Sequence, residues 1–250
     1  MQTPTRPPMR SSNPALREDV FSATRLDGGG TMTVQGTVNK TALLLVLALA
    51  TACASWVLGT AGGPGVAGWA IGASLAGLAV AIATILRPRW SPVTGPIYAL
   101  VEGVVLGVVS MWFEASYPGI AMQAVALTFG VLGAMLVLYK TRVIKVTERF
   151  RAGVLAATLA IAVVYLVAFV LGLFGVRVPL LNDAGPLGIL ISLAIVAVAA
   201  LNLVLDFDLI ERGARSGAPA YMEWYAAFGL LVTLVWLYLE LLRLLSKLRR

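Results

Sequence analysis

Two carboxylates lie inside long apolar runs of this chain. Glu102 falls within the run 95–112, and Asp206 falls near the end of the run 186–209. An ionised carboxylate in hydrocarbon is costly unless it is paired, protonated or hydrated, so such residues often mark ion or proton pathways. We take both as candidate ion ligands or proton acceptors. For Glu102 a protonated carboxyl that hydrogen-bonds a neighbouring helix is an equal alternative.

Polar residues near Asp206 extend this candidate site. Asn202 precedes Asp206 by four residues, so the two share a helix face and form a candidate polar stripe on the ion pathway. Asp208 is two residues further on and therefore belongs to another face. We expect Asp206 to point into the bundle and Asp208 toward its cytoplasmic mouth, as a candidate gate residue or as a headgroup-level charge paired with Arg212.

The last apolar run carries two more acids. Glu223 begins it at the inner mouth and is a candidate gate partner for Asp206 across the preceding loop. Glu240 lies near its far end beside Arg243, where we expect an interfacial charge satisfied by water or by an ion pair. Asp206, Glu223 and Asp208 together form the predicted pH-sensing gate.

The residues of common catalytic and cofactor sites are missing from the sequence. It has no histidine, a single cysteine (Cys53) inside the first apolar run, no glycine-rich phosphate loop and no Gly-x-Ser-x-Gly motif. We therefore expect neither an enzyme nor a bound cofactor. Any proton sensing must use carboxylates.

The composition indicates an integral membrane protein. Of the 250 residues 59% are hydrophobic and only 12% are charged, against about 25% charged in soluble domains. The net charge of +7 comes mainly from Lys and Arg at the ends of apolar runs, where they meet lipid headgroups. The expected partner is the bilayer, and nucleic acid is not expected.

Seven apolar runs are long enough to span a membrane, and each should be a helix because a segment in lipid must satisfy its own backbone hydrogen bonds. We predict an all-α, polytopic seven-helix bundle over residues 32–250, preceded by a disordered, uncleaved cytoplasmic tail, residues 1–31. Two glycine pairs, Gly68 with Gly72 and Gly103 with Gly107, predict close helix contacts. The runs are approximately 41–60, 65–86, 94–113, 119–139, 153–175, 186–209 and 221–242.

The basic residues predict the orientation. With a cytoplasmic N-terminus, the inside loops carry nine Lys and Arg residues, whereas the outside loops carry only Arg177. A C-terminal basic cluster disagrees, because it would lie outside; the alternative is that one of the last two runs is re-entrant. The nine are Arg87, Arg89, Lys140, Arg142, Lys145, Arg149, Arg151, Arg212 and Arg215, and the cluster is Arg243, Lys247, Arg249 and Arg250.

Three segments resemble one known family. Residues 205–211 (LDFDLIE), followed by a basic loop and by Tyr221 at the start of an apolar helix, resemble the last two spans of the Bax inhibitor (YccA-like, transmembrane Bax-inhibitor-motif) family. Residues 32–41 and 98–103 look like its bacterial branch, which has an N-terminal tail. The resemblance covers about residues 32–245, and the order of the motifs carries it.

The resemblance implies a bundle with the last helix central and a pH-sensitive calcium leak. In that family an aspartate of the sixth helix shares a proton with one of the seventh, which latches the pore at its cytoplasmic side. Asp206 matches the first aspartate, but the second falls near Leu231, where this chain has no acid. Either Glu102 or Glu223 replaces it, or this branch is gated differently. Two adjacent carboxyls cannot both ionise cheaply, so opening should follow a rise in pH.

The expected function is thus a pH-modulated passive cation leak channel, with calcium as the permeant ion and Asp206 and Glu102 as its candidate ligands. The expected location is a bacterial inner (plasma) membrane. The alternative is a membrane regulatory protein that binds and restrains a membrane protease or another partner. The long N-terminal tail favours the alternative, because a simple pore does not need it.

Overall fold

A computed structural model describes residues 30–62, 65–175 and 183–250, so residues 1–29 of the predicted tail lie outside the described part. Seven α-helices are present in these ranges, and each is long and apolar enough to cross a membrane. This confirms the all-α, seven-helix prediction. The helices are α2 (Val34–Thr60), α3 (Val66–Leu86), α4 (Ser91–Ser116), α5 (Ile120–Lys140), α6 (Glu148–Leu173), α8 (Pro186–Arg215) and α9 (Met222–Leu248), with a short 3₁₀ helix, η3 (Pro88–Trp90), before α4.

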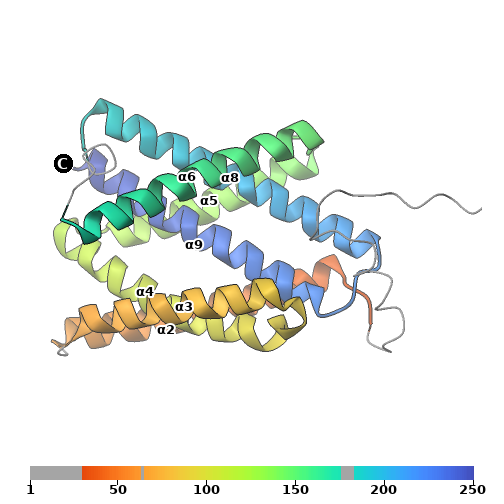
Figure 1. Cartoon of the computed structure of the whole chain (residues 1–250), viewed down its shortest axis with the longest axis horizontal. Coiled ribbons are helices and arrows are strands. Elements are labelled where there is room, and N and C mark those ends of the chain that lie inside the picture. Colours follow the sequence, from red (N-terminus) through yellow and green to blue (C-terminus); the bar gives the residue numbers. More distant parts are fainter. Residues whose placement is uncertain (1–29, 63–64, 176–182) are drawn as a thin grey trace, which may run out of the picture.

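The last helix is central, as the family resemblance implies. In the apolar part of α9, 56% of the residues are buried, whereas the figure for α6 is 6%. α9 packs against α2, α4, α5 and α8, while α6 packs mainly against α8 and α3 mainly against α4. Figure 1 shows α9 running between these two outer helices. The inner positions of the bundle are therefore those that face α9.

The two ends of the bundle are distinct. At one end the chain entering α2 pairs with the α8–α9 loop, where the Met32 backbone N–H donates to the Ala218 carbonyl at 2.7 Å. At the other end the Arg249 side chain donates to the Pro118 carbonyl at 2.8 Å, beside the α4–α5 turn. α8 and α9 have 30 and 27 residues and run from one end to the other (Figure 1). The re-entrant alternative is therefore wrong, and the nine loop cations gather at the end where α2 begins.

Two members of the C-terminal basic cluster, Arg243 and Lys247, are bound within the bundle. Arg243 pairs with Glu240 at 3.1 Å, as expected for Glu240, and also contacts Tyr165 of α6. Lys247 is buried and donates to the Gly188 carbonyl at 3.0 Å and to Ser192 at 2.8 Å. These two charges are therefore engaged in contacts between helices, at the end of the bundle opposite to the loop cations.

One of the two predicted glycine contacts is present. A Cβ atom at Gly103 would collide with the Ala48 carbonyl and the Thr51 hydroxyl of α2, and Gly107 is equally close to α2. Gly68 and Gly72 have no atom within 4 Å of such a Cβ, so that prediction is wrong. The tight seam of the bundle therefore joins α2 and α4, whereas α3 lies on the outside.

Candidate functional site

Asp206 holds an unusual position in the bundle. Its Oδ2 atom is the only buried side-chain oxygen or nitrogen without a hydrogen-bond partner among residues 30–62, 65–175 and 183–250. Buried polar atoms are nearly always paired, and an unpaired one requires an explanation such as a functional role. The prediction that Asp206 points into the bundle is therefore confirmed.

Thr233 of α9 is the polar side chain that faces the Asp206 carboxyl. Thr233 is itself buried, and its hydroxyl donates to the Gly229 carbonyl at 3.3 Å. Leu231, the position matched to the second family aspartate, instead packs with Leu44 and other residues of a separate apolar cluster. The residue opposite Asp206 is therefore two positions further along α9 and carries a hydroxyl in place of an acid.

Glu102 lines a cavity of about 540 Å³ between α3, α4, α8 and α9. Tyr98, one turn earlier on α4, lines the same cavity and is a polar neighbour of the Glu102 carboxyl. A Cβ atom at Gly77 of α3 would lie 3.2 Å from Glu102 Oε2, so the glycine gives the carboxylate room. Glu102 thus faces a cavity with polar neighbours, and both readings of the sequence, an ion ligand or a hydrogen-bonded carboxyl, remain predictions.

Glu102, Asp206 and Thr233 lie at one level of the bundle. Glu102 is eleven residues after Ser91, where α4 begins, and Thr233 is eleven residues after Met222, where α9 begins. Asp206 is nine residues before Arg215, where α8 ends. At about 1.5 Å per residue, Glu102, Asp206 and Thr233 therefore lie about 16, 14 and 16 Å from the same end of the bundle. In the described chain the two carboxyls do not contact each other. Gly229 of α9 connects the two carboxyl sites, because it lines the Glu102 cavity and lies one turn before Thr233, the residue that faces Asp206.

Asn202 and Asp208 lie apart from this level. The Asn202 amide donates to Thr158 of α6 at 2.8 Å and to the Val198 carbonyl at 2.9 Å, so it joins α8 to α6. Asp208 pairs with Arg212 at 2.6 Å, as predicted, and with Arg151 at 3.0 Å. The structure therefore does not place Asn202 in a shared polar stripe with Asp206, and Asp208 is an ion-paired residue near the end of α8.

Glu223 is not a partner of Asp206. Its carboxylate is buried, forms an ion pair with Lys40 and accepts hydrogen bonds from the Thr33 backbone at 2.7 Å and the Thr33 hydroxyl at 2.8 Å. Gly36 leaves the space that this carboxylate fills. The predicted approach to Asp206 is therefore wrong, because both Glu223 oxygens hold the start of α2 against α9.

Sequence reasoning missed Thr233, Tyr98 and Lys40. The four-residue spacing of Tyr98 and Glu102 was a usable signal for their contact. The pairing of Lys40 with Glu223 spans most of the chain and left no local signal. Within the described ranges no three His, Cys, Asp or Glu residues cluster closely enough to hold a metal ion. A cation near Asp206 or Glu102 would therefore need hydroxyl, carbonyl or water oxygens as well.

The fold and site define a polytopic seven-helix membrane protein with a buried carboxyl facing its central last helix. A family model described as Bax inhibitor 1 like matches residues 13–250, nearly the whole chain. The chain belongs to this family, which confirms the resemblance; the bacterial branch remains a prediction. A comparison with curated proteins gave no match. The family is not a known enzyme family.

Proposed function

We propose that this protein is a passive cation leak channel, with calcium as its permeant ion, and that the protonation state of Asp206 modulates it. Members of the family are proposed calcium channels or regulators. The observation that carries the proposal is the buried, unpartnered Oδ2 atom of Asp206 at the interface with the central helix. The proposed location is a bacterial inner membrane. The proposed orientation has a cytoplasmic N-terminus, because the loop cations gather at the end where α2 begins.

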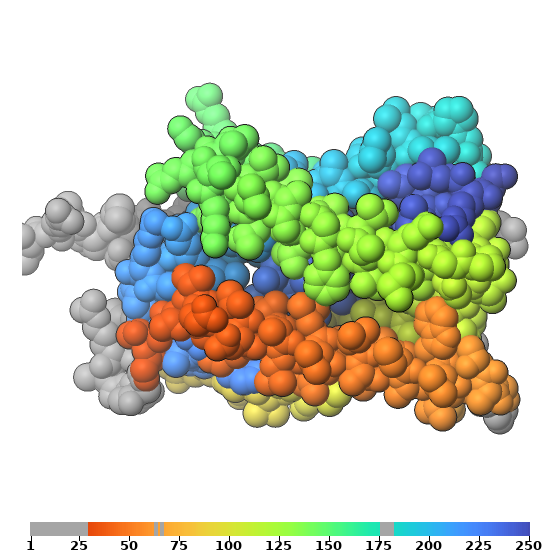
Figure 2. Space-filling model, turned by 180° about the vertical axis from the view of Figure 1, so that it is seen from behind, coloured from red at the N-terminus to blue at the C-terminus, as the bar shows by residue number. Residues whose placement is uncertain are grey.

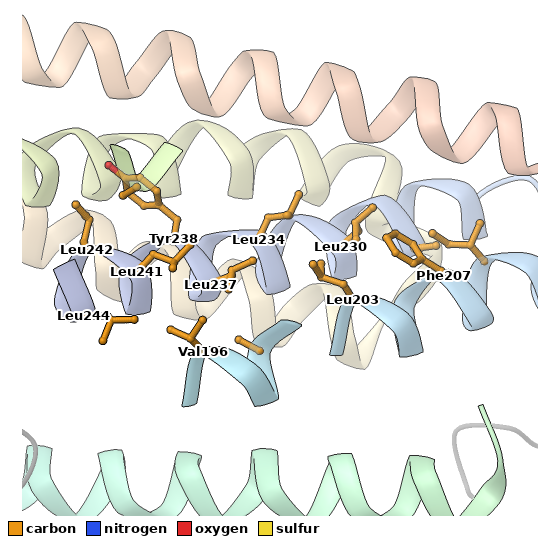
Figure 3. Packing of buried hydrophobic residues seen from close by; sticks show 14 of the residues in the cluster. Val196, Leu203, Phe207, Leu230, Leu234, Leu237, Tyr238, Leu241, Leu242 and Leu244 are labelled. Carbon is orange, nitrogen blue, oxygen red and sulfur yellow. The ribbon is translucent and has the colours of Figure 1, made fainter. Parts of the chain in front are cut away.

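In this proposal the packing around Asp206 is that of the closed channel. Leu203 of α8 and Leu230, Leu234 and Leu237 of α9 are all buried members of one apolar cluster to which both helices contribute (Figure 3). Side chains packed this tightly leave no room for a hydrated ion. Conduction therefore requires α8 and α9 to separate around Asp206.

Protonation of Asp206 controls this separation in the proposal. A neutral carboxyl facing Thr233 tolerates the dry interface, whereas an ionised one has no cationic partner in the described residues and strongly favours hydration. Deprotonation should therefore draw water and cations between the helices. The leak should grow as the pH rises.

Glu102 supplies a second carboxylate at the same level. Calcium prefers six to eight oxygen ligands, including carboxylates, hydroxyls, carbonyls and water. Asp206 and Glu102 would provide the charge, while water and the hydroxyls of Tyr98 and Thr233 would complete the shell. A site with few fixed ligands binds weakly, and weak binding lets a permeant ion leave.

The test is calcium flux into liposomes containing the purified protein, between about pH 6 and about pH 8. Asp206→Asn keeps the shape but stays neutral, so flux should remain low and independent of pH. Asp208→Asn is the matched control, since it makes the same change two residues away in an ion-paired residue, and it should keep the pH response. If the Asp206 variant conducts and responds to pH as the unmodified protein does, the proposal is wrong.

The second candidate function is a membrane regulatory protein that restrains a protease or another partner. The observation that favours it is α6, whose apolar side chains are mostly exposed and which packs mainly against α8. Deleting the N-terminal tail separates the two functions: a channel should keep its flux, and an adaptor should lose its partner in a pull-down. The deletion should end at residue 29, because Gly30 and Thr31 pair with the α8–α9 loop.

A further inference from the structure

A deep groove lies between α2 and α5, away from the Glu102 cavity. Its volume is about 790 Å³, within the range of about 300–1,000 Å³ usual for ligand sites. α2 and α5 form its walls, and α8 and α9 contribute Phe207 and Leu230. Figure 2 shows a hollow between α2 (red to orange) and α5 (green), with the blue of the last helices in its floor.

The inner part of the groove is lined by apolar side chains. Leu45 of α2 and Leu132 and Leu136 of α5 line it together with Leu230. Leu132 is eight residues before Lys140, the last residue of α5, so the groove extends about 12 Å from the helix end toward the bilayer centre. Such walls suit a hydrocarbon chain rather than a polar solute.

The mouth of the groove is basic. Lys140, Arg142 and Lys145 are exposed, and their side chains have no ion pair or hydrogen bond within the described residues. Other charges at the mouth are already engaged: Asp208 pairs with Arg151 and Arg212, and Glu211 pairs with Arg215 and accepts from Tyr139. The three free cations therefore give the mouth an uncompensated positive charge.

Arg142 shapes this mouth. Its φ of 58° makes it the one non-glycine residue with positive φ in the described ranges, at the end of α5 where glycine is usual. The turn bends the chain back, so that the Val143 and Ile144 backbone N–H groups donate to the Leu138 carbonyl. Ile144 then lines the groove beside the cations.

We propose that this groove binds one anionic phospholipid. Its phosphate would lie among Lys140, Arg142 and Lys145, and an acyl chain would lie between α2 and α5. Basic pockets between membrane helices recognise anionic headgroups in this way, and the loop cations place this mouth at headgroup level. The excess positive charge disfavours a metal cation there, and a neutral lipid would leave the three cations without a counter-charge.

The lipid would contact the channel helices directly. Phe207 and Leu230, which line the groove, are also members of the packed α8–α9 interface, and Phe207 is adjacent to Asp206. A bound acyl chain would therefore support the closed packing. The binding site itself stands on the groove and its charges, and it does not depend on whether the protein conducts calcium.

The test measures binding of a fluorescent phosphatidylglycerol to the full-length protein in neutral detergent, with phosphatidylcholine of the same chains as comparison. We expect phosphatidylglycerol to bind about tenfold tighter. The variant Lys140→Gln/Arg142→Gln/Lys145→Gln should lose about tenfold in affinity. The control Arg87→Gln/Arg89→Gln/Arg149→Gln removes the same charge from the same end of the bundle, and it should bind as the unmodified protein does. Equal losses in both variants would mean diffuse charge attraction and would overturn the proposal.

Three further experiments test the acyl chain and distinguish the phospholipid from other occupants of the groove. Leu136→Trp fills the groove without changing charge, so it should weaken phosphatidylglycerol binding; no effect contradicts an acyl chain in the groove. Inorganic phosphate should not compete at matched concentration, and equal competition would indicate a free-anion site instead. Neutralising the tail acids in the full chain (Glu18→Gln/Asp19→Asn/Asp27→Asn) should leave affinity unchanged, whereas a tenfold gain would make the tail the occupant.

Discussion

Thr233 of the central helix faces Asp206 of α8, in the place where a proton-sharing pair of acids would need its second carboxyl. A hydroxyl can donate one hydrogen bond but cannot share a proton with the aspartate or repel it. In the proposed channel a single carboxyl would therefore act through its own hydration, whereas a pair of acids would act through mutual repulsion.

Placing an acid at this position should create such a pair. In Thr233→Asp, two carboxyls face each other across a dry interface, and both cannot ionise cheaply, so the closed form should persist to higher pH. We expect the rise in calcium flux to move up by about one pH unit or more. Flux in liposomes across a pH series measures this shift. Thr233→Ser keeps the hydroxyl and should behave as the unmodified protein, and an unshifted curve for Thr233→Asp would show that the two side chains do not meet.

Glu102 should affect ion passage without setting the pH response. Its carboxylate faces the cavity beside Gly229, whereas the dry, unpartnered oxygen belongs to Asp206. We expect Glu102→Gln to lower calcium flux severalfold at every pH while the pH midpoint stays in place. Glu148→Gln is the control, because Glu148 is exposed at the start of α6. A shifted midpoint with unchanged flux would instead make Glu102 the sensor.

Sequence alone predicted what depends on local spacing. Apolar length gave the seven helices, and four-residue or three-residue spacing gave the Asp208–Arg212 and Glu240–Arg243 pairs. The partner of Glu223 was not predictable, because Lys40 and Thr33 lie at the other end of the chain. Knowing that a residue is inside a bundle also does not tell which neighbour it faces, because that depends on the rotation of each helix.

Thr233, Asn202 and Gly72 illustrate this rotational uncertainty. Counting along the sequence matched the second family aspartate to a position near Leu231, but a shift of two residues turns a helix by about 200° and changes the neighbour completely. Asn202 is similarly turned toward α6. The Gly68–Gly72 spacing equals that of Gly103 and Gly107, yet only the second pair faces another helix.

The α2–α4 seam should be sensitive to a single methyl group. A Cβ atom at Gly103 would meet the Ala48 carbonyl, which is backbone and cannot turn aside. We expect Gly103→Ala to lower the free energy of unfolding by about 1–3 kcal/mol. Gly72→Ala makes the same change on α3, where nothing lies within 4 Å, and should be neutral or slightly stabilising. Thermal unfolding in detergent compares them, and equal stabilities would contradict the close packing of α2 on α4.

Gly36 should be equally intolerant for a different reason. An added Cβ would collide with the Glu223 carboxylate, which holds Thr33 and Lys40 at the start of α2. Because displacing this buried carboxylate breaks its ion pair with Lys40 and its hydrogen bonds with Thr33, we expect Gly36→Ala to cost about 1–3 kcal/mol of unfolding free energy. Gly130→Ala, in an open position of α5, is the matched control and should not lower the melting temperature. Hydrogen exchange of the Thr33 amide separates the cause: it should accelerate only in Gly36→Ala, and if it stays protected there, the carboxylate does not hold this end of α2.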